Sequence, residues 1–367
     1  MTGKIAYFGK DGKIGFTRQE LPEPEAGALL VKVLSSNICG SDVKNWKSGV
    51  SLGVGGDRTC QGHEFVGRIL RLGEGVTADS AGQPIQAGDR IVAAYYITCG
   101  ECRACKLGRY DQCENAYIHL GQSPDSAPYF SGTFATHYYV YPKQQFFKVP
   151  DTLPDALAAG VNCRFSQIYY GLERLDIRAG ETLLIQGAGP MGLYAVAIAR
   201  EKGVRTIVVD GIAQRLELAR RFGADETVSM EDYPTVEERV QAVKALTGGR
   251  GPDAAVEVTG FAGAFEEGIR YLAPLGRYVI IGINVVSANA VISPGYITRK
   301  ALTVCGVARY LPEYLRKSME FLDKFQNKYP FGEFSTQTFG LEQLEEALQV
   351  TADRKVEQAV IIPEEET

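Results

Sequence analysis

The spacing of hydrophobic positions changes near residue 156. Before that point the apolar residues form short β-branched or aromatic runs between Gly and Pro turns, a pattern that predicts strands. These runs are residues 28–36, 64–73, 89–97 and 133–142. The first part of the chain is therefore predicted to be a mostly β domain.

After residue 156, strand-like apolar runs alternate with amphipathic segments of helical periodicity. A strand, a helix and a second strand are predicted over 181–210, and the alternation continues through residue 283. This order is typical of a parallel sheet with helices on both faces. In the tail, the pattern predicts helices over 312–325 and 341–354 and a closing strand over 358–363.

Composition narrows the class of protein. The chain has 367 residues, 45% of them hydrophobic, which is enough for two domains with separate cores. No apolar run reaches the roughly 18 residues of a membrane helix, and the start lacks a signal-peptide pattern, so we expect a cytoplasmic protein. The net charge of −5 is spread along the chain, which disfavours nucleic acid and membrane as partners. The expected partner is a small molecule.

Half of the eight cysteines lie in one short loop, at Cys99, Cys102, Cys105 and Cys113. In a reducing compartment cysteines stay as thiols unless they hold metal or react, so metal binding is favoured over disulfides. Four thiolates fill a tetrahedral shell and leave no position for substrate, so the loop is predicted to hold a structural zinc. Iron would use similar ligands, although zinc is the commoner ion in a closed structural lobe.

A glycine-rich turn follows the first strand of the alternating segment. Gly187, Gly189 and Gly192 form a GxGxxG pattern between a predicted strand and a predicted helix, and Asp210 ends the next strand. In that context the glycines let backbone approach a pyrophosphate at the helix N-terminus, and the acid binds the adenosine ribose. Asp210 would repel a 2′-phosphate and the two residues after it carry no cation, so NAD is favoured over NADP, even with Arg215 nearby.

Few ligand-type residues remain for a second metal site. Cys39, His63, Glu64 and Cys163 are available, but spacing alone does not join them. A lone buried Cys usually behaves as a small apolar residue, and a lone His usually as a satisfied hydrogen-bonding group. On the residues alone, other side chains are equally eligible: Cys60, Cys305, His119 and His137.

Taken together, the motifs resemble those of the zinc-dependent medium-chain dehydrogenases, which include liver alcohol dehydrogenase, sorbitol dehydrogenase and threonine dehydrogenase. The resemblance covers nearly the whole chain. It rests on CGSD at 39–42, GHE at 62–64, GDRI at 88–91, the four-cysteine lobe, and GAGPMG at 187–192 with its downstream acid. Segments such as DRIVAAYYITCGECRAC and FKVPDTLP are most similar to the bacterial branch that contains 5-exo-hydroxycamphor dehydrogenase.

The resemblance implies an α/β architecture of two domains. A GroES-like, mostly β catalytic domain would comprise 1–160 and 300–367, with the structural zinc lobe at 95–115. A Rossmann domain with a doubly wound parallel sheet would comprise 161–299 and bind NAD. The active site is then expected in the cleft between the domains. Family members pair through strands of the nucleotide sheet, so 277–286 and the next strand are candidates for a homodimer or homotetramer seam.

The resemblance also implies a catalytic zinc, and with it two zinc ions per chain. Its ligands would be Cys39, His63 and Cys163, whereas sorbitol-type members carry Glu at the last position. Glu64 would lie behind the metal as an alternate ligand, and Asp42 would orient His63. Three protein ligands leave one position open, where the metal eases loss of the proton from an alcohol before hydride passes to NAD.

One departure from the family concerns the proton. Ser41 matches the hydroxyl that takes the alcohol proton inward, and many relatives pass it on through a His three residues later. This chain has Lys44 at that position. Lys44 could relay the proton if its pKa were depressed, or it could hold the coenzyme while water carries the proton.

The remaining implied roles concern the pocket and the coenzyme. Arg164 follows Cys163 where relatives tend to have a small residue, so an anionic or polyhydroxylated substrate is one hypothesis, and a role for Arg164 in an ion pair facing away is the alternative. Trp46 and Tyr95 would line the apolar side of the pocket. The coenzyme would also contact Pro190 and Met191 in the glycine motif and the backbone of Ile281 to Ile283.

The main interpretation is thus an NAD-linked zinc dehydrogenase acting on a secondary alcohol or its ketone, with a polyol or hydroxyamino-acid dehydrogenase as the alternative. A zinc-ribbon protein that binds nucleic acid is a different class, and the mixed charge of the lobe disfavours it. The charged residues there are Glu101, Arg103, Lys106, Arg109, Asp111 and Glu114. The zinc-free quinone reductases of the same fold lack the cysteine lobe and both ligand motifs.

Overall fold

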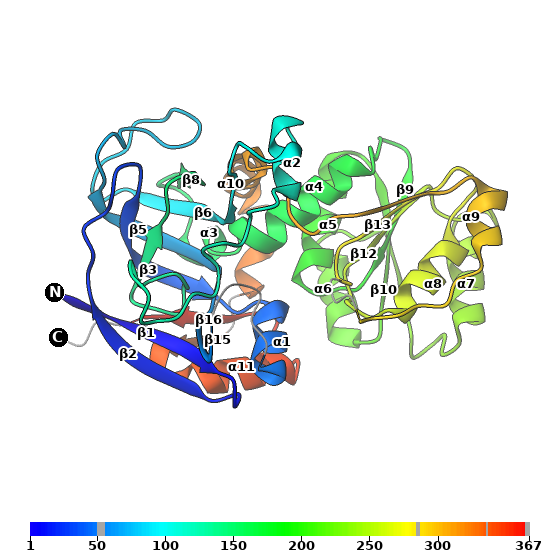
Figure 1. The fold of residues 1–367 in the computed structure, drawn as a ribbon. Coiled ribbons are helices and arrows are strands. Elements are labelled where there is room, and N and C mark those ends of the chain that lie inside the picture. The colour runs from blue at the N-terminus through cyan, green and yellow to red at the C-terminus, as the bar shows by residue number, and fades with distance from the viewer. Residues whose placement is uncertain (50–55, 284–286, 335–336, 364–367) are drawn as a thin grey trace. The chain divides into compact units, whose positions relative to one another are not determined.

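The computed structural model describes residues 1–49, 56–283, 287–334 and 337–363. The chain divides into two compact units (Figure 1). Unit 1 comprises Met1–Cys163, Leu311–Gln326 and Phe331–Thr367, and unit 2 comprises Arg164–Tyr310 and Asn327–Pro330. None of the described helices combines the length and hydrophobicity that a bilayer crossing requires.

Unit 1 is built on two sheets, as the short apolar runs predict. The smaller sheet has the order β2-β1-β4, and the seven-stranded sheet has the order β15-β16-β3-β5-β6-β8 with β7 also paired to β3. The strands are β1 (Thr2–Gly9), β2 (Ile14–Glu20), β3 (Leu29–Asn37), β4 (Arg58–Cys60), β5 (Glu64–Leu72), β6 (Arg90–Ile97), β7 (His137–Val140), β8 (Gln144–Lys148), β15 (Gln337–Gly340) and β16 (Ala359–Ile362).

Helices pack against the strands of unit 1. Helix α11 packs against α1 and β16, and the apolar side of α10 is buried, with Leu315, Met319 and Leu322 spaced as a helix requires. The helices of unit 1 are α1 (Gly40–Ser48), α2 (Arg103–Lys106), η1 (Tyr110–Gln112), α3 (Asp155–Ala158), α10 (Glu313–Phe325), η3 (Phe331–Phe334), η4 (Leu341–Gln343) and α11 (Leu344–Ala352). A π-helical turn, η2 (Val161–Phe165), leads into unit 2.

Unit 2 contains the predicted parallel sheet, in the order β11-β10-β9-β12-β13-β14. Its strands are β9 (Thr182–Gln186), β10 (Arg205–Asp210), β11 (Glu226–Ser229), β12 (Ala254–Glu257), β13 (Arg277–Ile280) and β14 (Thr303–Gly306). Its helices are α4 (Ser166–Arg174), α5 (Pro190–Glu201), α6 (Ala213–Arg221), α7 (Val236–Ala245), α8 (Gly263–Tyr271) and α9 (Pro294–Lys300).

Helices cover both faces of this sheet, which is why its central strands are buried along nearly their whole length. On one face, residues of α7 and α8 form a core with Leu184, Val209 and Tyr278. On the other face, α4 packs against β13, while α5 contacts β9 and β10 (Figure 1). The order reverses between β9 and β12, where parallel sheets of this kind bind nucleotides.

Unit 2 differs from the expected domain of 161–299, because it begins at Arg164, continues to Tyr310 and includes Asn327–Pro330. Strand β14 pairs in parallel with β13, with Cys305 opposite Val279, so the chain stays in unit 2 through Tyr310 and not only to residue 299. The apolar residues of β14 supply the last strand of the parallel sheet, which the sequence pattern assigns to the catalytic domain. Of the expected seam, β13 is an interior strand and residues 284–286 lie outside the described residues.

Candidate metal centres and nucleotide cradle

Four potential metal ligands from separate segments of unit 1 converge on one point. Cys39 precedes α1, His63 precedes β5, Glu64 begins β5, and Cys163 lies in the turn η2. One ligand atom from each side chain lies within 4.8 Å of the others. Tertiary structure therefore selects this mixed cluster among the ligand-type residues that spacing left undecided. In the described part of the chain, the cysteines and histidines outside this cluster and the lobe join neither group of ligands.

Asp42 links two members of the mixed cluster. The backbone N–H of Cys39 donates a 2.8 Å hydrogen bond to Asp42 Oδ2, as expected where a carboxylate in the first turn caps its own helix. The other carboxylate oxygen lies 3.3 Å from Nδ1 of His63. Asp42 is only 1% exposed. Its position leaves Nε2 of His63 as the nitrogen that can reach a metal.

The charge of Asp42 controls the protonation of His63. Burial lowers the pKa of His63, but the Asp42 carboxylate and hydrogen bonds with Asp42 and Cys39 outweigh burial, so the pKa lies well above its usual value. A proton on His63 and a metal ion are thus alternative ways to place positive charge between Asp42 and Cys39. The site favours a cation.

Asn162 holds the turn that carries Cys163, and it belongs to none of the sequence motifs. Its side chain is fully buried and donates hydrogen bonds to the carbonyls of His63 (2.9 Å) and Ala93 (3.1 Å). Its Oδ1 accepts from the backbone N–H of Phe65 at 3.3 Å. One amide therefore joins η2 to β5 and β6 beside the cluster. Its partners are distant in sequence, so no local pattern could reveal it.

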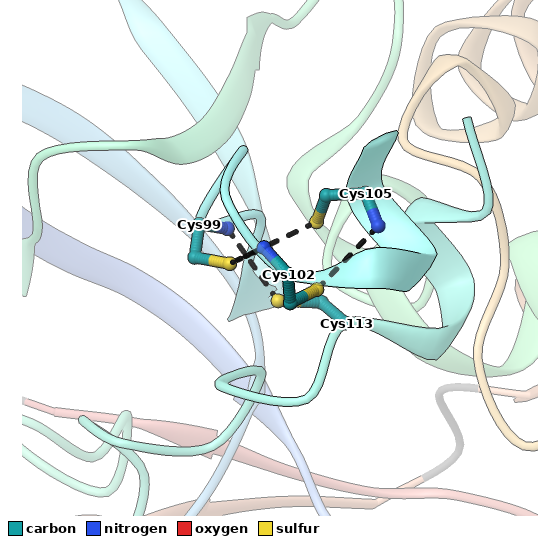
Figure 2. Close-up of side chains that lie close together, drawn as sticks. All are labelled: Cys99, Cys102, Cys105 and Cys113. Carbon is teal, nitrogen blue, oxygen red and sulfur yellow. Dashed lines mark hydrogen bonds between the residues drawn. The ribbon is translucent and has the colours of Figure 1, made fainter. Parts of the chain in front are cut away.

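The four-cysteine lobe forms the second group of ligands, shown in Figure 2. Its four sulfur atoms also lie within 4.8 Å of one another. Backbone N–H groups of Cys102 and Cys105 donate to the sulfurs of Cys99 and Cys102 at 3.4 Å, and the N–H of Cys99 donates to Cys113 at 3.4 Å. Such N–H···S contacts stabilise thiolates.

The lobe thiols have unequal acidities. Backbone N–H groups of Cys102 and Glu101 lower the pKa of Cys99 to about 6, whereas burial raises the pKa of Cys105 to about 12. Four thiolates this close repel one another unless a cation lies among them. The donor set of the lobe fits a closed structural zinc. The sulfur, nitrogen and oxygen donors of the mixed cluster are of the kinds that bind zinc in catalytic centres.

The glycine turn has the shape that a dinucleotide requires. Gly187 has φ of +104°, and a Cβ on Gly192 would lie 1.9 Å from the carbonyl oxygen of Gly187, so no side chain fits there. Gly189 is the N-cap of α5, and a Cβ there would meet no atom within 4 Å. The turn thus packs tightly against its own strand and is open at the helix N-terminus, where a pyrophosphate fits.

Asp210 closes this turn from the end of β10. Its Oδ2 accepts from the N–H of Ala188 at 2.6 Å, and its Oδ1 accepts from the N–H of Ile212 at 2.8 Å. Both contacts fix the carboxylate beside the glycine motif and leave lone pairs for ribose hydroxyls. Arg215 lies half-buried in the first turns of α6.

Comparison with known proteins gives consistent matches along the chain. Residues 25–151 match the alcohol dehydrogenase GroES-like domain, and residues 190–324 match the zinc-binding dehydrogenase family. A 5-exo-hydroxycamphor dehydrogenase from Pseudomonas putida is 33% identical over 332 residues, covering 89% of this chain and 90% of its own.

The chain belongs to the zinc-dependent medium-chain dehydrogenases.

Further relatives agree with this assignment. An L-threonine 3-dehydrogenase from Pyrococcus furiosus is 31% identical, with 78% of this chain and 77% of the relative covered. The crystal structure of an alcohol dehydrogenase from Thermotoga maritima has a TM-score of 0.90 at 28% identity, covering 99% of this chain and 100% of that chain. The protein is an oxidoreductase that acts on the CH–OH group of a small-molecule alcohol, with zinc and NAD as cofactors.

The predicted pocket residues of this dehydrogenase have different surroundings. The ring of Tyr95 lies 5.3 Å from that of His63, edge to face, and its centroid lies 6.4 Å from that of Tyr117, with nearly parallel planes. Trp46 instead donates its indole N–H to the carbonyl of Gly12 at 2.9 Å and packs against the core under α11. Trp46 is only partly buried in this core, and its role in the substrate pocket stays a prediction.

The other predicted site residues occupy both units. Ser41 is half-buried in the first turn of α1, Lys44 is exposed on the same helix, and Arg164 is buried in η2. Pro190 and Met191 form the first turn of α5, and Ile281 and Ile283 follow β13. Their roles stay predictions.

Proposed function

We propose that this dehydrogenase oxidises a secondary alcohol to a ketone at the cluster of Cys39, His63 and Cys163, and that the four-cysteine lobe holds a second, structural zinc. The observation that carries the proposal is the convergence of sulfur, nitrogen and carboxylate donors within 4.8 Å, in a chain whose other unit has a nucleotide-binding sheet. A mixed set of ligands with an exchangeable position suits catalysis, whereas a shell of four cysteines leaves no position for substrate.

The chemistry divides between cofactors and protein. A zinc ion at the mixed cluster would supply the Lewis acid that eases loss of the alcohol proton, and NAD would accept the hydride. Asp42 keeps the imidazole of His63 oriented through its 3.3 Å contact with Nδ1. Asn162 keeps Cys163 beside His63 through the His63 carbonyl. Glu64, the fourth donor in the cluster, is an alternate ligand that could exchange with substrate.

The proton leaves by way of Ser41 in this proposal. Ser41 is half-buried, two residues from Cys39, at the start of a helix whose later turns reach solvent. Lys44 is exposed on that helix, where water can reach the proton path. Water therefore carries the proton beyond Ser41, and Lys44 contributes positive charge for a coenzyme phosphate.

The substrate pocket has an aromatic wall beside the metal. The rings of Tyr95 and His63 meet edge to face, and the Tyr95 ring lies nearly parallel to that of Tyr117. Flat aromatic rings favour an apolar, ring-shaped alcohol over an open-chain polyol. The relative from Pseudomonas putida acts, by its name, on a hydroxylated camphor, which is a cyclic secondary alcohol. A cyclic secondary alcohol is therefore the first substrate class to test.

The oligomeric state and the cellular location complete the proposal. The protein forms a homodimer or homotetramer through the β14 side of the parallel sheet, which is the last strand of that sheet among the described residues. It works in the reducing cytoplasm, because all eight cysteines are free of disulfides and six of them belong to the two metal clusters.

Metal analysis of single variants tests the assignment of the two sites. The intact protein should contain two zinc ions per chain, Cys163→Ala should contain one, and Cys163→Ala should lose NAD-linked oxidation of cyclic secondary alcohols while remaining folded. Cys60→Ala is the matched control, because Cys60 is a buried cysteine outside both clusters. A single zinc ion in the intact protein that Cys163→Ala does not change would overturn the proposed catalytic site.

A further inference from the structure

A buried carboxylate at the end of β12 joins the loop after β12 to the loop after β13. Glu257 is fully buried and is the last residue of that strand. Its Oε1 accepts from the N–H of Thr259 at 2.6 Å, the hydroxyl of Thr259 at 2.8 Å and the N–H of Gly260 at 2.7 Å. Its Oε2 accepts from the N–H of Ile283 at 3.0 Å, across to the loop after β13.

The backbone of the same residue extends this link. The Glu257 carbonyl accepts from the N–H groups of Ile281 (3.0 Å) and Gly282 (3.1 Å). A Cβ on Gly282 would lie 2.5 Å from the backbone nitrogen of Gly260, so the two loops touch backbone to backbone. Each of these contacts uses an oxygen of Glu257 as the acceptor, either of the carboxylate or of the backbone carbonyl.

This junction adjoins the glycine turn. A Cβ on Gly187 would lie 3.1 Å from the side-chain methyl of Thr259, so the loop that Glu257 organises packs against the first glycine of the motif. Strands β9 and β12 flank the reversal of strand order, where a dinucleotide binds. Asp210 fixes the adenosine half of that site, and no residue that the sequence analysis identified fixes the loops on the opposite side.

We propose that Glu257 is a positioning residue for the nicotinamide half of NAD. The inference rests on the proposed NAD-linked function and on the coenzyme contact that the family resemblance implies for the backbone of Ile281 to Ile283. Glu257 uses the N–H groups of Ile281, Gly282 and Ile283, so any backbone contact of these residues with the carboxamide uses their carbonyl oxygens. Those carbonyls accept from the carboxamide NH₂, and Glu257 sets their direction.

Replacement by glutamine separates this role from general stability. In Glu257→Gln, the amide oxygen can still accept from Thr259 and Gly260, but the amide NH₂ then faces the N–H of Ile283 and the link to that loop is lost. The measurement compares two dissociation constants. One is that of NADH, monitored by NADH fluorescence, and the other is that of ADP-ribose, which lacks the nicotinamide. We expect about tenfold weaker NADH binding and less than about a twofold change for ADP-ribose.

Two further variants complete the test. Glu267→Gln breaks another buried carboxylate contact in unit 2, with Arg239 at 2.6 Å, and should lower stability without a change in either constant. Thr259→Val removes the hydroxyl that donates to Glu257 and should weaken NADH binding less than Glu257→Gln does. This variant tests the inference if Glu257→Gln does not fold. Equal weakening of NADH and ADP-ribose, or no change in either, would overturn the inference. Failure of the unmodified protein to bind NADH would instead refute the proposed function.

Discussion

Replacement of Asn162 by alanine should release zinc from the mixed cluster as well as lower stability. The change removes the two hydrogen bonds that the Asn162 amide donates, at 2.9 Å and 3.1 Å, and the one it accepts at 3.3 Å. At about 1 kcal/mol each, the three bonds amount to a loss of about 3 kcal/mol in the free energy of unfolding. Because one of them anchors the backbone of His63 beside Cys163, the cluster should open.

Gln144 provides a matched control. It is another buried amide of unit 1, which donates to the carbonyl of Ala94 (2.6 Å) and the hydroxyl of Tyr138 (2.8 Å) and accepts from the N–H of Tyr141 (3.0 Å). Gln144→Ala should therefore cost about as much stability, about 3 kcal/mol, as Asn162→Ala. It should leave both zinc sites filled, because Ala94, Tyr138 and Tyr141 are not metal ligands.

The assay combines urea unfolding with metal analysis after dialysis against a zinc chelator. We expect Asn162→Ala to retain one zinc ion per chain, in the four-cysteine lobe, where Gln144→Ala retains two. If both variants lose the same free energy and keep the same zinc content, Asn162 is only a core residue and the reasoning about the turn at Cys163 is refuted.

Three further predictions follow from the metal and coenzyme sites. Zinc affinity at the mixed cluster should rise with pH, because Asp42 holds the pKa of His63 above its usual value and zinc must displace the proton that the ring holds at lower pH. In a competitive zinc titration, Asp42→Asn should make this pH dependence shallower, and an unchanged slope would contradict the prediction. Cys105→Ser should remove one zinc ion and lower the melting temperature while the mixed cluster keeps its zinc, so loss of both ions would refute independent sites. Asp210→Asn should lower the ratio of kcat/KM for NAD over NADP by about tenfold, and a constant ratio would show that Asp210 does not select the coenzyme.

Local patterns were sufficient for much of the fold. The alternation of apolar runs and amphipathic segments predicts β9, α5 and β10 closely, because strand and helix periodicity are properties of neighbouring residues. The β1–β2 hairpin and α7 were not predicted, since β2 and α7 have few buried residues and the adjacent buried pair Ile5 and Ala6 interrupts the alternation in β1. The place of β14 in the parallel sheet depends on its pairing with β13, which a local pattern does not contain.

The sequence by itself determined the four-cysteine lobe, the glycine turn and the family, because these signals lie within short stretches of chain. Only tertiary structure decided which other residues meet. Cys39, His63 and Cys163 converge because β3, β5 and the turn at Asn162 bring them together, and Glu257 reaches Ile283 because β12 and β13 are neighbours. Side chains distant in sequence meet through strand pairing and buried hydrogen bonds, and those contacts form only in the folded chain.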